Sequence, residues 1–407
     1  MSSEDIQIER LLVVGIDATS VSLSASKAGF EVFGVDYFGD IDLKRNCKVS
    51  SSLREQGILF DSRDFSSKDN MQGLARIAGK IVSEHEVDGI LLASGLEDYP
   101  GIVGELQDFS DIIGNPPEAM RRARDWESLF RQMRRRGVSC PETEITKTLD
   151  EAKRAARDIG YPIVLKPSKG SGGIGISLVR TVEELEKKYP SNILGDKEML
   201  IQEYIHGIHA SASIISTDAE ARVSCLTEQL IGDQKLGQRE PFGWCGNIVP
   251  LDAPVEIVKE SIESVKRIIE GLGVVGSNGV DFVISNSGVP YLIEVNPRFQ
   301  ETIECVENYL DTNIVLDHIN ACLRNRLPQE LSGRKESWAR FVLFAIRRSY
   351  VERTFADETI RNIPPPASII DMGNPVCSII LSGKDRSSIL REGYTKIEDL
   401  RKLLSTP

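Results

Sequence analysis

The sequence predicts an α/β and α+β chain with a doubly wound N-terminal domain at residues 1–115, a central domain at 116–330 and a small C-terminal α+β module at 331–407. Two observations lead to this prediction. Strand and helix patterns alternate in the first part, and a stiff Asn-Pro-Pro linker follows at residues 115–117. A chain of 407 residues, 41% of them hydrophobic, is long enough for two or three domains with sizeable cores.

The N-terminal part alternates short apolar runs with helical patterns. The expected elements are strands at 10–15, 31–36 and 88–93 and helices at 20–29 and 71–86. This alternation is typical of a doubly wound parallel sheet. The first strand is not followed by Gly-x-Gly-x-x-Gly, so we expect no NAD site.

The central part begins with a basic amphipathic helix at residues 118–136. Acidic residues lie among its arginines, so we interpret it as a solvated face rather than a nucleic-acid surface. Residues 231–247 are too long for a simple turn, and we expect a substrate loop there. Further elements are helices at 150–159 and 254–271 and strands at 209–216 and 222–230.

Residues 161–176 form a predicted strand that ends at Lys166, followed by a loop of small residues. Pro167 keeps Lys166 extended, because a residue before proline avoids the α region. Glycines let backbone N–H groups approach a polyanion, and Lys166 adds a point charge for phosphate oxygens. The loop is not a Walker A loop. A flexible turn between strands is the alternative. The glycines are Gly170, Gly172, Gly173 and Gly175.

Residues 199–207 are a predicted strand that runs into a turn at Gly207. A strand that stops at a turn can offer its exposed backbone N–H and C=O groups to a flat heterocycle such as adenine. The same residues would also suit an ordinary strand, so this segment alone does not decide between the two.

Residues 279–298 predict a β-hairpin, because two β-branched and aromatic runs flank an Asn-Ser-Gly turn. If Ser285 pairs with Pro290, Asp281 faces Glu294 on the neighbouring strand. The hairpin therefore brings two carboxylates together.

Strand alternation places Asn296 on the same face as Glu294. Facing carboxylates repel unless a cation or a shared proton lies between them. Oxygen ligands with room for water and phosphate suit Mg²⁺. We therefore expect a metal site at Asp281, Glu294 and Asn296, and the alternative is a solvated hairpin face. The opposite, apolar face is expected to be core, and it consists of Phe282, Ile284, Ile293 and Val295.

The C-terminal module is expected to contain strands at 338–347 and 376–381, a proline break at 364–366 and a final helix at 396–404. Seven scattered cysteines without Cys-x-x-Cys indicate reduced thiols rather than zinc or disulfides. A net charge of −12 argues against nucleic acid and anionic membranes. Residues 1–5 are polar and acidic, so we expect no signal peptide and a cytoplasmic enzyme.

Taken in this order, the lysine strand, the glycine-rich loop, residues 199–207 and the hairpin resemble the ATP-grasp superfamily of carboxylate–amine and carboxylate–thiol ligases. The resemblance extends from residue 11 to about 325 and is strongest over 161–176, 199–209 and 279–301. It implies that the N-terminal domain is a pre-ATP-grasp domain and that the centre has the ATP-grasp fold.

The resemblance also implies roles for individual residues. Lys166 and Arg298 would be catalytic, and Asp281, Glu294 and Asn296 would hold Mg²⁺, with Mn²⁺ as the alternative metal. ATP would be bound by Lys166, Ser168, Gly170, Ser171, Gly172, Gly173, Glu203, Tyr204, Ile205 and His209.

Two positions depart from the family pattern. Many members have a phosphate-binding lysine where this chain has Trp126, so that contact is either missing or supplied by another residue. Many members also have a ribose-binding glutamate near the position of His209. This histidine can hydrogen-bond a hydroxyl, and it can equally be an ordinary strand residue.

The activity implied is an ATP-dependent carboxylate–amine ligase that works through an acyl phosphate. The alternatives are a carboxylase that forms carboxyphosphate and a nucleotide-binding regulatory protein without turnover. Partners would be a small-molecule carboxylate and an amine, without nucleic acid or membrane, and a homodimer stays open. The sequence does not name the acid or the amine. Candidates for a polar substrate pocket are Glu97, Glu228, Lys235, Arg239 and Arg298.

Overall fold

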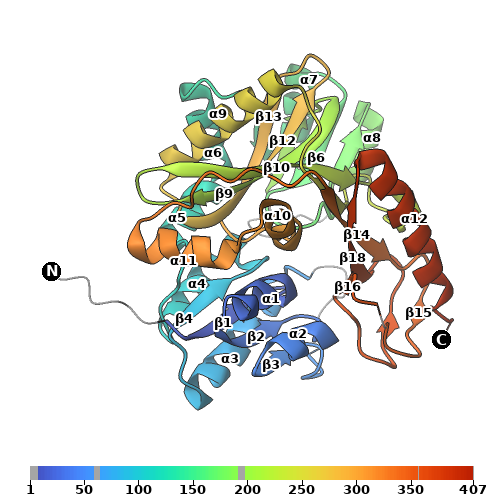
Figure 1. Ribbon diagram of the computed structural model, residues 1–407. Helices are drawn as coiled ribbons and strands as arrows, with labels where there is room; N and C mark the ends of the chain where they lie inside the picture. The colour runs from blue at the N-terminus through green and yellow to red at the C-terminus, as the bar shows by residue number, and fades with distance from the viewer. Residues whose placement is uncertain (1–7, 59–64, 191–197, 356, 407) are drawn as a thin grey trace.

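The computed structural model describes residues 8–58, 65–190, 198–355 and 357–406. Residues 1–5, for which we expect no signal peptide, lie outside these ranges. The described residues form a parallel N-terminal sheet, a small antiparallel sheet and a large antiparallel sheet (Figure 1). This arrangement confirms the predicted α/β and α+β fold class. Among the described residues, no helix is both long and apolar enough to cross a bilayer.

The N-terminal sheet has the strand order β3-β2-β1-β4, with every pair parallel. The doubly wound prediction is therefore confirmed, although the sequence patterns did not reveal α2, β3 or α4. The elements are β1 (Arg10–Val14), α1 (Thr19–Lys27), β2 (Glu31–Asp36), α2 (Ile41–Asn46), β3 (Val49–Ser52), α3 (Lys68–Glu84), β4 (Gly89–Leu92), the 3₁₀ turn η1 (Leu96–Asp98) and α4 (Pro100–Gln107).

The single helix predicted at 118–136 is wrong, because the chain forms two helices there, α5 (Pro117–Arg124) and α6 (Trp126–Arg135). Asp125 lies between them in an extended conformation, and its side chain accepts a hydrogen bond from the N–H of Ser128. An aspartate at this position caps the second helix and so interrupts the first. The break turns Trp126 into the core beneath the large sheet.

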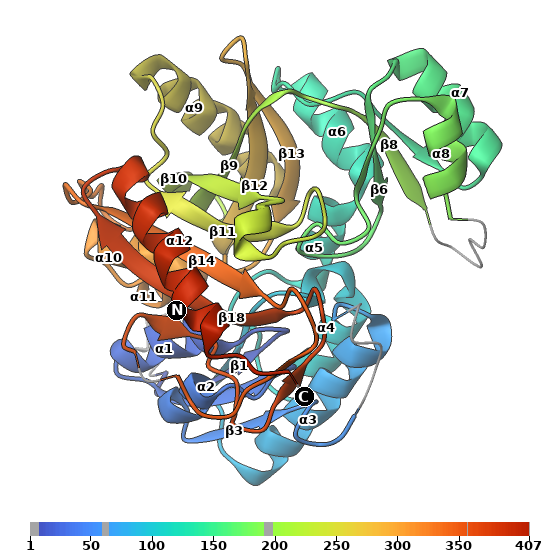
Figure 2. The ribbon, with the colours of Figure 1, turned by 90° about the vertical axis from the view of Figure 1, so that its right-hand side faces the viewer.

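The small sheet has the order β5-β8-β6-β7 and carries two helices (Figure 2). Alanines of α7 pack against its apolar residues in a separate core. The sheet places Lys166 and Glu203 on adjacent antiparallel strands, because Lys166 pairs with Leu200 and Ile163 with Glu203. The elements are β5 (Thr143–Thr146), α7 (Leu149–Ile159), β6 (Ile163–Pro167), β7 (Ser177–Val179), α8 (Val182–Lys188) and β8 (Met199–Glu203).

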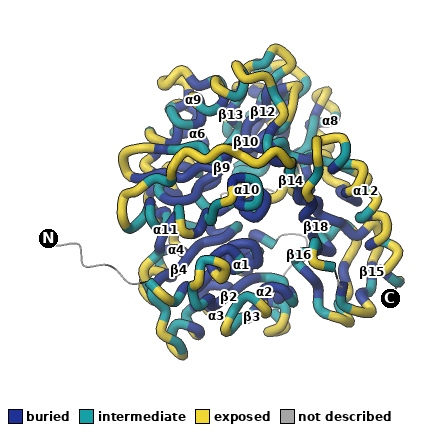
Figure 3. Tube along the Cα trace, in the orientation of Figure 1, coloured by how far each residue is buried: buried dark blue, intermediate teal, exposed yellow. Residues whose placement is uncertain are grey.

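The large sheet has eight strands in the order β13-β12-β9-β10-β11-β14-β18-β16, and the C-terminal strands extend it. Its strands are mostly buried, whereas the connection 325–336 to β14 is mostly exposed (Figure 3). The elements are β9 (Gly207–Ser216), β10 (Ala221–Ile231), η2 (Gln234–Leu236), β11 (Trp244–Val249), α9 (Val255–Leu272), β12 (Gly276–Ser285), β13 (Pro290–Asn296), α10 (Ile303–Leu310), α11 (Ile314–Arg324), β14 (Ser337–Phe344), β16 (Ile360–Arg361), β18 (Pro375–Gly383) and α12 (Arg386–Lys402), with β15 (Ser349–Tyr350) and β17 (Ile369–Ile370) as a separate ribbon.

The hairpin of β12 and β13 pairs Asp281 with Glu294, as predicted. The predicted pairing of Ser285 with Pro290 is wrong, because Pro290 pairs with Ile284. The register shifts by one residue between Asp281 and Phe282, which indicates a β-bulge near Ile293. Ile293 was expected in the core, but it is half-buried and faces a cavity instead.

Arg340 on β14 connects three parts of the chain. Its guanidinium is 2% exposed and lies 3.5 Å from both Asp17 of the N-terminal domain and Glu301 of the central domain. It also donates to the carbonyl oxygen of Glu301 at 2.7 Å and to Ser20 Oγ at 2.9 Å. A buried charge needs such a full set of partners, so Arg340 fixes how β14 meets the N-terminal domain.

We predict that Arg340→Met lowers the free energy of unfolding by ~3–5 kcal/mol, because it leaves the half-buried carboxylates of Asp17 and Glu301 without their buried counter-charge. Urea denaturation followed by circular dichroism measures this change. Arg334→Met is the matched control, since Arg334 pairs with Asp311 while 49% exposed, and its removal should cost less than ~1 kcal/mol. Equal effects of the two variants would contradict this role for Arg340.

His318 on α11 connects the central sheet to the segment that follows α4. The imidazole is buried, its Nδ1 accepts the N–H of Ser277 at 2.7 Å, and its Nε2 donates to the carbonyl oxygen of Ile113 at 2.8 Å. A second proton, on Nδ1, would point at the N–H of Ser277, which is itself a donor, so the charged imidazolium does not fit here. Burial lowers the pKa of His318 to about 4.

This shift predicts a loss of stability in acid. The unfolded chain binds a proton near pH ~6.5 and the folded chain only near 4, so stability falls as the pH drops through this window. Between pH 7.5 and 5 the free energy of unfolding should fall by ~2 kcal/mol more in the parent protein than in His318→Asn. The asparagine keeps a hydrogen-bond acceptor but does not titrate. Urea denaturation midpoints of both proteins at the two pH values test this prediction. An equal loss of stability in the parent protein and in His318→Asn would refute it.

Candidate active site

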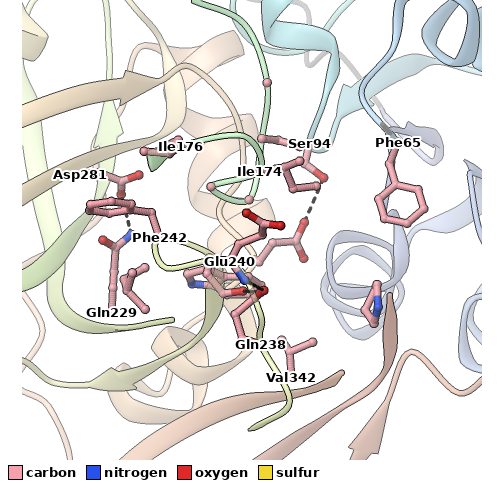
Figure 4. A pocket seen from close by; sticks show the side chains of 18 of the residues that line it. Phe65, Ser94, Ile174, Ile176, Gln229, Gln238, Glu240, Phe242, Asp281 and Val342 are labelled. Atoms are coloured by element: carbon pink, nitrogen blue, oxygen red, sulfur yellow. Dashed lines mark hydrogen bonds between the residues drawn. The ribbon is translucent and has the colours of Figure 1, made fainter. Parts of the chain in front are cut away.

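One cavity of about 720 Å³ lies where the N-terminal domain, the two antiparallel sheets and the C-terminal strands meet. In Figure 4, Phe65 and Ser94 face it from the N-terminal domain, whereas Gln229 and Asp281 lie on the large sheet and share a hydrogen bond. Val342 contributes from β14. The cavity is therefore built by residues far apart in the sequence.

The structure brings nearly all the predicted site residues together in this cavity. Of the residues predicted to be catalytic or to bind ATP or metal, only Ser168 does not line it, and the roles of the others stay predictions. The predicted residues that line it are Lys166, Gly170, Ser171, Gly172, Gly173, Glu203, Tyr204, Ile205, His209, Asp281, Glu294, Asn296 and Arg298.

The predicted metal patch is a hydrogen-bonded group. Asp281 accepts from Gln229 Nε2 at 3.0 Å and from Asn296 Nδ2 at 3.1 Å. Lys166 Nζ forms an ion pair with Glu294, whose side chain is 21% exposed. In this arrangement the ammonium group of Lys166 neutralises one of the two facing carboxylates.

The two carboxylates differ in acidity. Burial, together with the neighbouring Glu294, raises the pKa of Asp281 to about 6. Burial would raise the pKa of Glu294 as well, but the charges of Lys166 and Arg124 outweigh it and hold this pKa at about 2. Asp281 thus lacks a strong counter-charge, and a divalent cation beside it would supply one.

These residues fit Mg²⁺ only with help from a ligand. Among the described residues, no group of three or more histidine, cysteine, aspartate or glutamate side chains could hold a metal. Asp281 and Glu294 supply two carboxylates, and a half-turn of the Asn296 amide would present its oxygen instead of its nitrogen. Mg²⁺ often binds through one or two carboxylates plus phosphate oxygens, so the patch suits a metal that arrives with a nucleotide.

Arg298 lies two residues after the end of β13, and its Nε donates to Glu97 Oε1 at 2.7 Å. Glu97 is 4% exposed and belongs to η1 of the N-terminal domain. Burial would raise the pKa of Glu97, but the charges of Arg298 and Arg124 lower it. The guanidinium is therefore fixed at the cavity wall by a charge from another domain.

The neighbouring Asp98 does not line the cavity but contacts the glycine-rich loop, and the sequence patterns did not reveal this. Its Oδ1 accepts from Arg124 Nε at 2.7 Å, and its Oδ2 accepts from the N–H of Gly170 at 3.0 Å. Arg124 and Asp98 are 9% and 6% exposed. No local signal marks this contact, because the three residues are distant in the sequence.

The predicted adenine segment lies beside the substrate loop. The ring centre of Tyr204 lies 4.5 Å from that of His206 and 6.3 Å from that of Phe242. Glu203 donates its N–H to the carbonyl oxygen of Glu142 at 2.8 Å, which extends the pairing of β5 and β8. Burial lowers the pKa of His209 on β9, so this ring is a neutral hydrogen-bonding group at the cavity wall.

The predicted substrate loop contains η2 and ends where β11 begins at Trp244. Arg239, Phe242 and Trp244 line the cavity. Two residues expected in the polar pocket lie elsewhere. Lys235 is stacked over Tyr394 of α12 at 4.6 Å. Glu228 pairs with Arg386, also of α12, at 2.6 Å. Both expectations are therefore wrong, because these two side chains contact α12 instead of lining the cavity.

Residues 123–302 match the ATP-grasp domain family. The uncharacterized protein MJ0776 of Methanocaldococcus jannaschii is 25% identical over 405 residues, which cover 97% of this chain and 93% of that protein. The carbamoyl phosphate synthase large chain of Thermotoga neapolitana is 25% identical over 257 residues, which are 62% of this chain and 23% of that protein. The aligned region thus spans about a quarter of this synthase chain.

Solved structures share the fold. The biotin carboxylase–β-γ-ATP complex from Campylobacter jejuni superposes with a TM-score of 0.74 at 18% identity, covering 96% of this chain and 91% of that chain. The L-amino acid ligase from Bacillus licheniformis superposes with a TM-score of 0.71 at 15% identity, covering 96% and 97%. The parallel N-terminal sheet, the antiparallel sheets and the family match agree, and this chain is an ATP-grasp domain protein with a fold like that of biotin carboxylase.

Proposed function

We propose that the protein is an ATP-dependent ligase that joins a carboxylate to an amine through an acyl phosphate. The observation that supports this most is the convergence of Lys166, Arg298 and the facing carboxylates Asp281 and Glu294 in one cavity beside a glycine-rich loop. Phosphoryl transfer needs mainly positioning and neutralisation of charge, and these residues provide both.

In the proposed reaction, a carboxylate oxygen of the substrate attacks the γ-phosphorus of ATP, and the bond from phosphorus to the ADP oxygen breaks. Lys166 neutralises phosphate oxygens, and Arg298 holds the acid or the transferring group with parallel hydrogen bonds. Mg²⁺, held by Asp281, Glu294 and Asn296, would supply further charge neutralisation. The amine lone pair then attacks the acyl carbon, phosphate leaves, and the amine loses a proton.

A carboxylase that forms carboxyphosphate from bicarbonate is the second candidate, because the fold is like that of biotin carboxylase. The cavity supports the ligase instead. Its lining includes the aromatic residues Phe38 and Phe65 and Met372 of the C-terminal part as well as Arg298, and its volume of about 720 Å³ gives room for an organic acid and an amine.

The direct test measures ADP release with Mg²⁺ while carboxylate and amine pairs are varied, with bicarbonate as a separate arm. Mass spectrometry identifies the product. An amide that forms only with both substrates supports the ligase, and ADP release that depends on bicarbonate supports the carboxylase. If the protein binds nucleotide but releases no ADP with any of these substrates, the third hypothesis, a regulatory protein without turnover, would be favoured.

We predict that Glu294→Gln reduces turnover at least ~100-fold, because it removes one carboxylate ligand and leaves phosphate charge less neutralised. The fold should be retained, since the amide can still accept from Lys166 and the repulsion with Asp281 is relieved. Steady-state kinetics and a melting curve on the same sample measure both effects. Glu240→Gln is the control at another carboxylate of the cavity wall. A Glu294→Gln variant with parental turnover would exclude the metal assignment.

We predict that Arg298→Lys leaves ATP binding largely intact but slows amide formation by ~100-fold, as expected when one transition-state donor is lost. Lysine cannot reproduce two parallel hydrogen bonds. Calorimetric titration with ATP and product formation are measured together. The competing explanation is that Arg298 only anchors the strand end to Glu97, in which case the variant would melt earlier and keep its rate.

A further inference from the structure

The glycine-rich loop is held at every second residue by a partner from a different part of the chain. Residues 168–172 are exposed or half-exposed, so these contacts rather than burial fix the loop. The three contacts are the indole Nε1–H of Trp126 to the carbonyl oxygen of Ser168 (2.8 Å), the N–H of Gly170 to Asp98 Oδ2 (3.0 Å) and the N–H of Trp244 to the carbonyl oxygen of Gly172 (3.1 Å).

Trp126 makes a second contact with the nucleotide site. The ammonium of Lys166 lies 4.4 Å from the centre of the Trp126 ring, and the guanidinium carbon of Arg124 lies 5.2 Å from it. The indole is 5% exposed and stacks on Phe130 at 5.9 Å. A desolvated ring face attracts a cation more strongly than an exposed one, so one side chain holds both the start of the loop and the head of Lys166.

We propose that Trp126 is a positioning residue that sets the glycine-rich loop and Lys166 in their nucleotide-binding arrangement before the nucleotide arrives. The proposal rests on the proposed binding of ATP at this site. A loop that is ordered in advance loses less entropy on binding, and this raises affinity.

The alternative explanation is that Trp126 only marks a phosphate contact that this chain has lost. A lysine at 126 would then restore the contact and tighten binding. The geometry argues against this alternative. A lysine there would place a third positive charge beside Lys166 and Arg124 and would remove the hydrogen bond to Ser168. The two explanations therefore predict opposite effects of the same substitution.

The experiment titrates Mg²⁺ and ATP into the full-length protein by calorimetry. Trp126→Phe keeps the stacked ring and removes the indole N–H, so it should weaken ATP binding by about 3- to 10-fold. Asp98→Asn releases the charged contact to Gly170 and should weaken binding by about 10-fold or more. Trp126→Lys should also weaken binding. The control is Trp338→Phe, because the Nε1 of Trp338 has no hydrogen-bond partner in the described structure.

Hydrogen exchange of the amides at 168–173, measured without nucleotide, supplies a second readout. Trp126→Phe should speed their exchange, and Trp338→Phe should not. Unchanged exchange in Trp126→Phe would overturn the proposal even if the parent protein bound no ATP, which by itself would refute only the proposed function. Tighter ATP binding by Trp126→Lys, or parental affinity in Trp126→Phe, would also overturn it.

Discussion

Three buried or half-buried cations at or beside the cavity are each neutralised by a carboxylate from a different part of the chain, and the structure depends on this constraint. Lys166 pairs with Glu294, Arg298 with Glu97, and Arg124 with Asp98. An unpaired buried charge is strongly destabilising, so the strands and the N-terminal domain must meet where these charges meet. Arg340, between Asp17 and Glu301, applies the same constraint to the C-terminal strands.

If ATP binds here as proposed, the same pairing would prepare the cavity for it. MgATP would bring both a polyanion and a divalent cation, so Lys166 could turn from Glu294 to a phosphate while the metal takes its place beside the carboxylate. No buried charge need stay unpaired during such an exchange. Arg124 differs, because Asp98 and the Trp126 ring hold it outside the cavity lining. Its charge instead helps to keep Glu294 ionised.

The sequence predicted the fold class, and it selected residues that the structure brings to one cavity, because both follow from local patterns. The pairing of Asp281 with Glu294 is correct although its starting point, Ser285 with Pro290, is wrong. The register nearest the turn is off by one residue, and the bulge near Ile293 restores it. Strand periodicity carries no information about such an insertion. The break at Asp125 could have been predicted, since an aspartate directly before the apolar Trp126 is a helix-capping signal.

The remaining site residues could not be predicted, because their partners are distant in the sequence. Asp98 and Gly170 are separated by 72 positions, and Glu97 and Arg298 by 201. Trp126 shows how this affects the interpretation of a departure from a family pattern. In the sequence alone it is an absent charge, whereas in the structure its ring and N–H contact Lys166 and the loop. A site can lose a charged contact with its ligand and still be ordered by a neutral side chain, provided that other cations remain nearby.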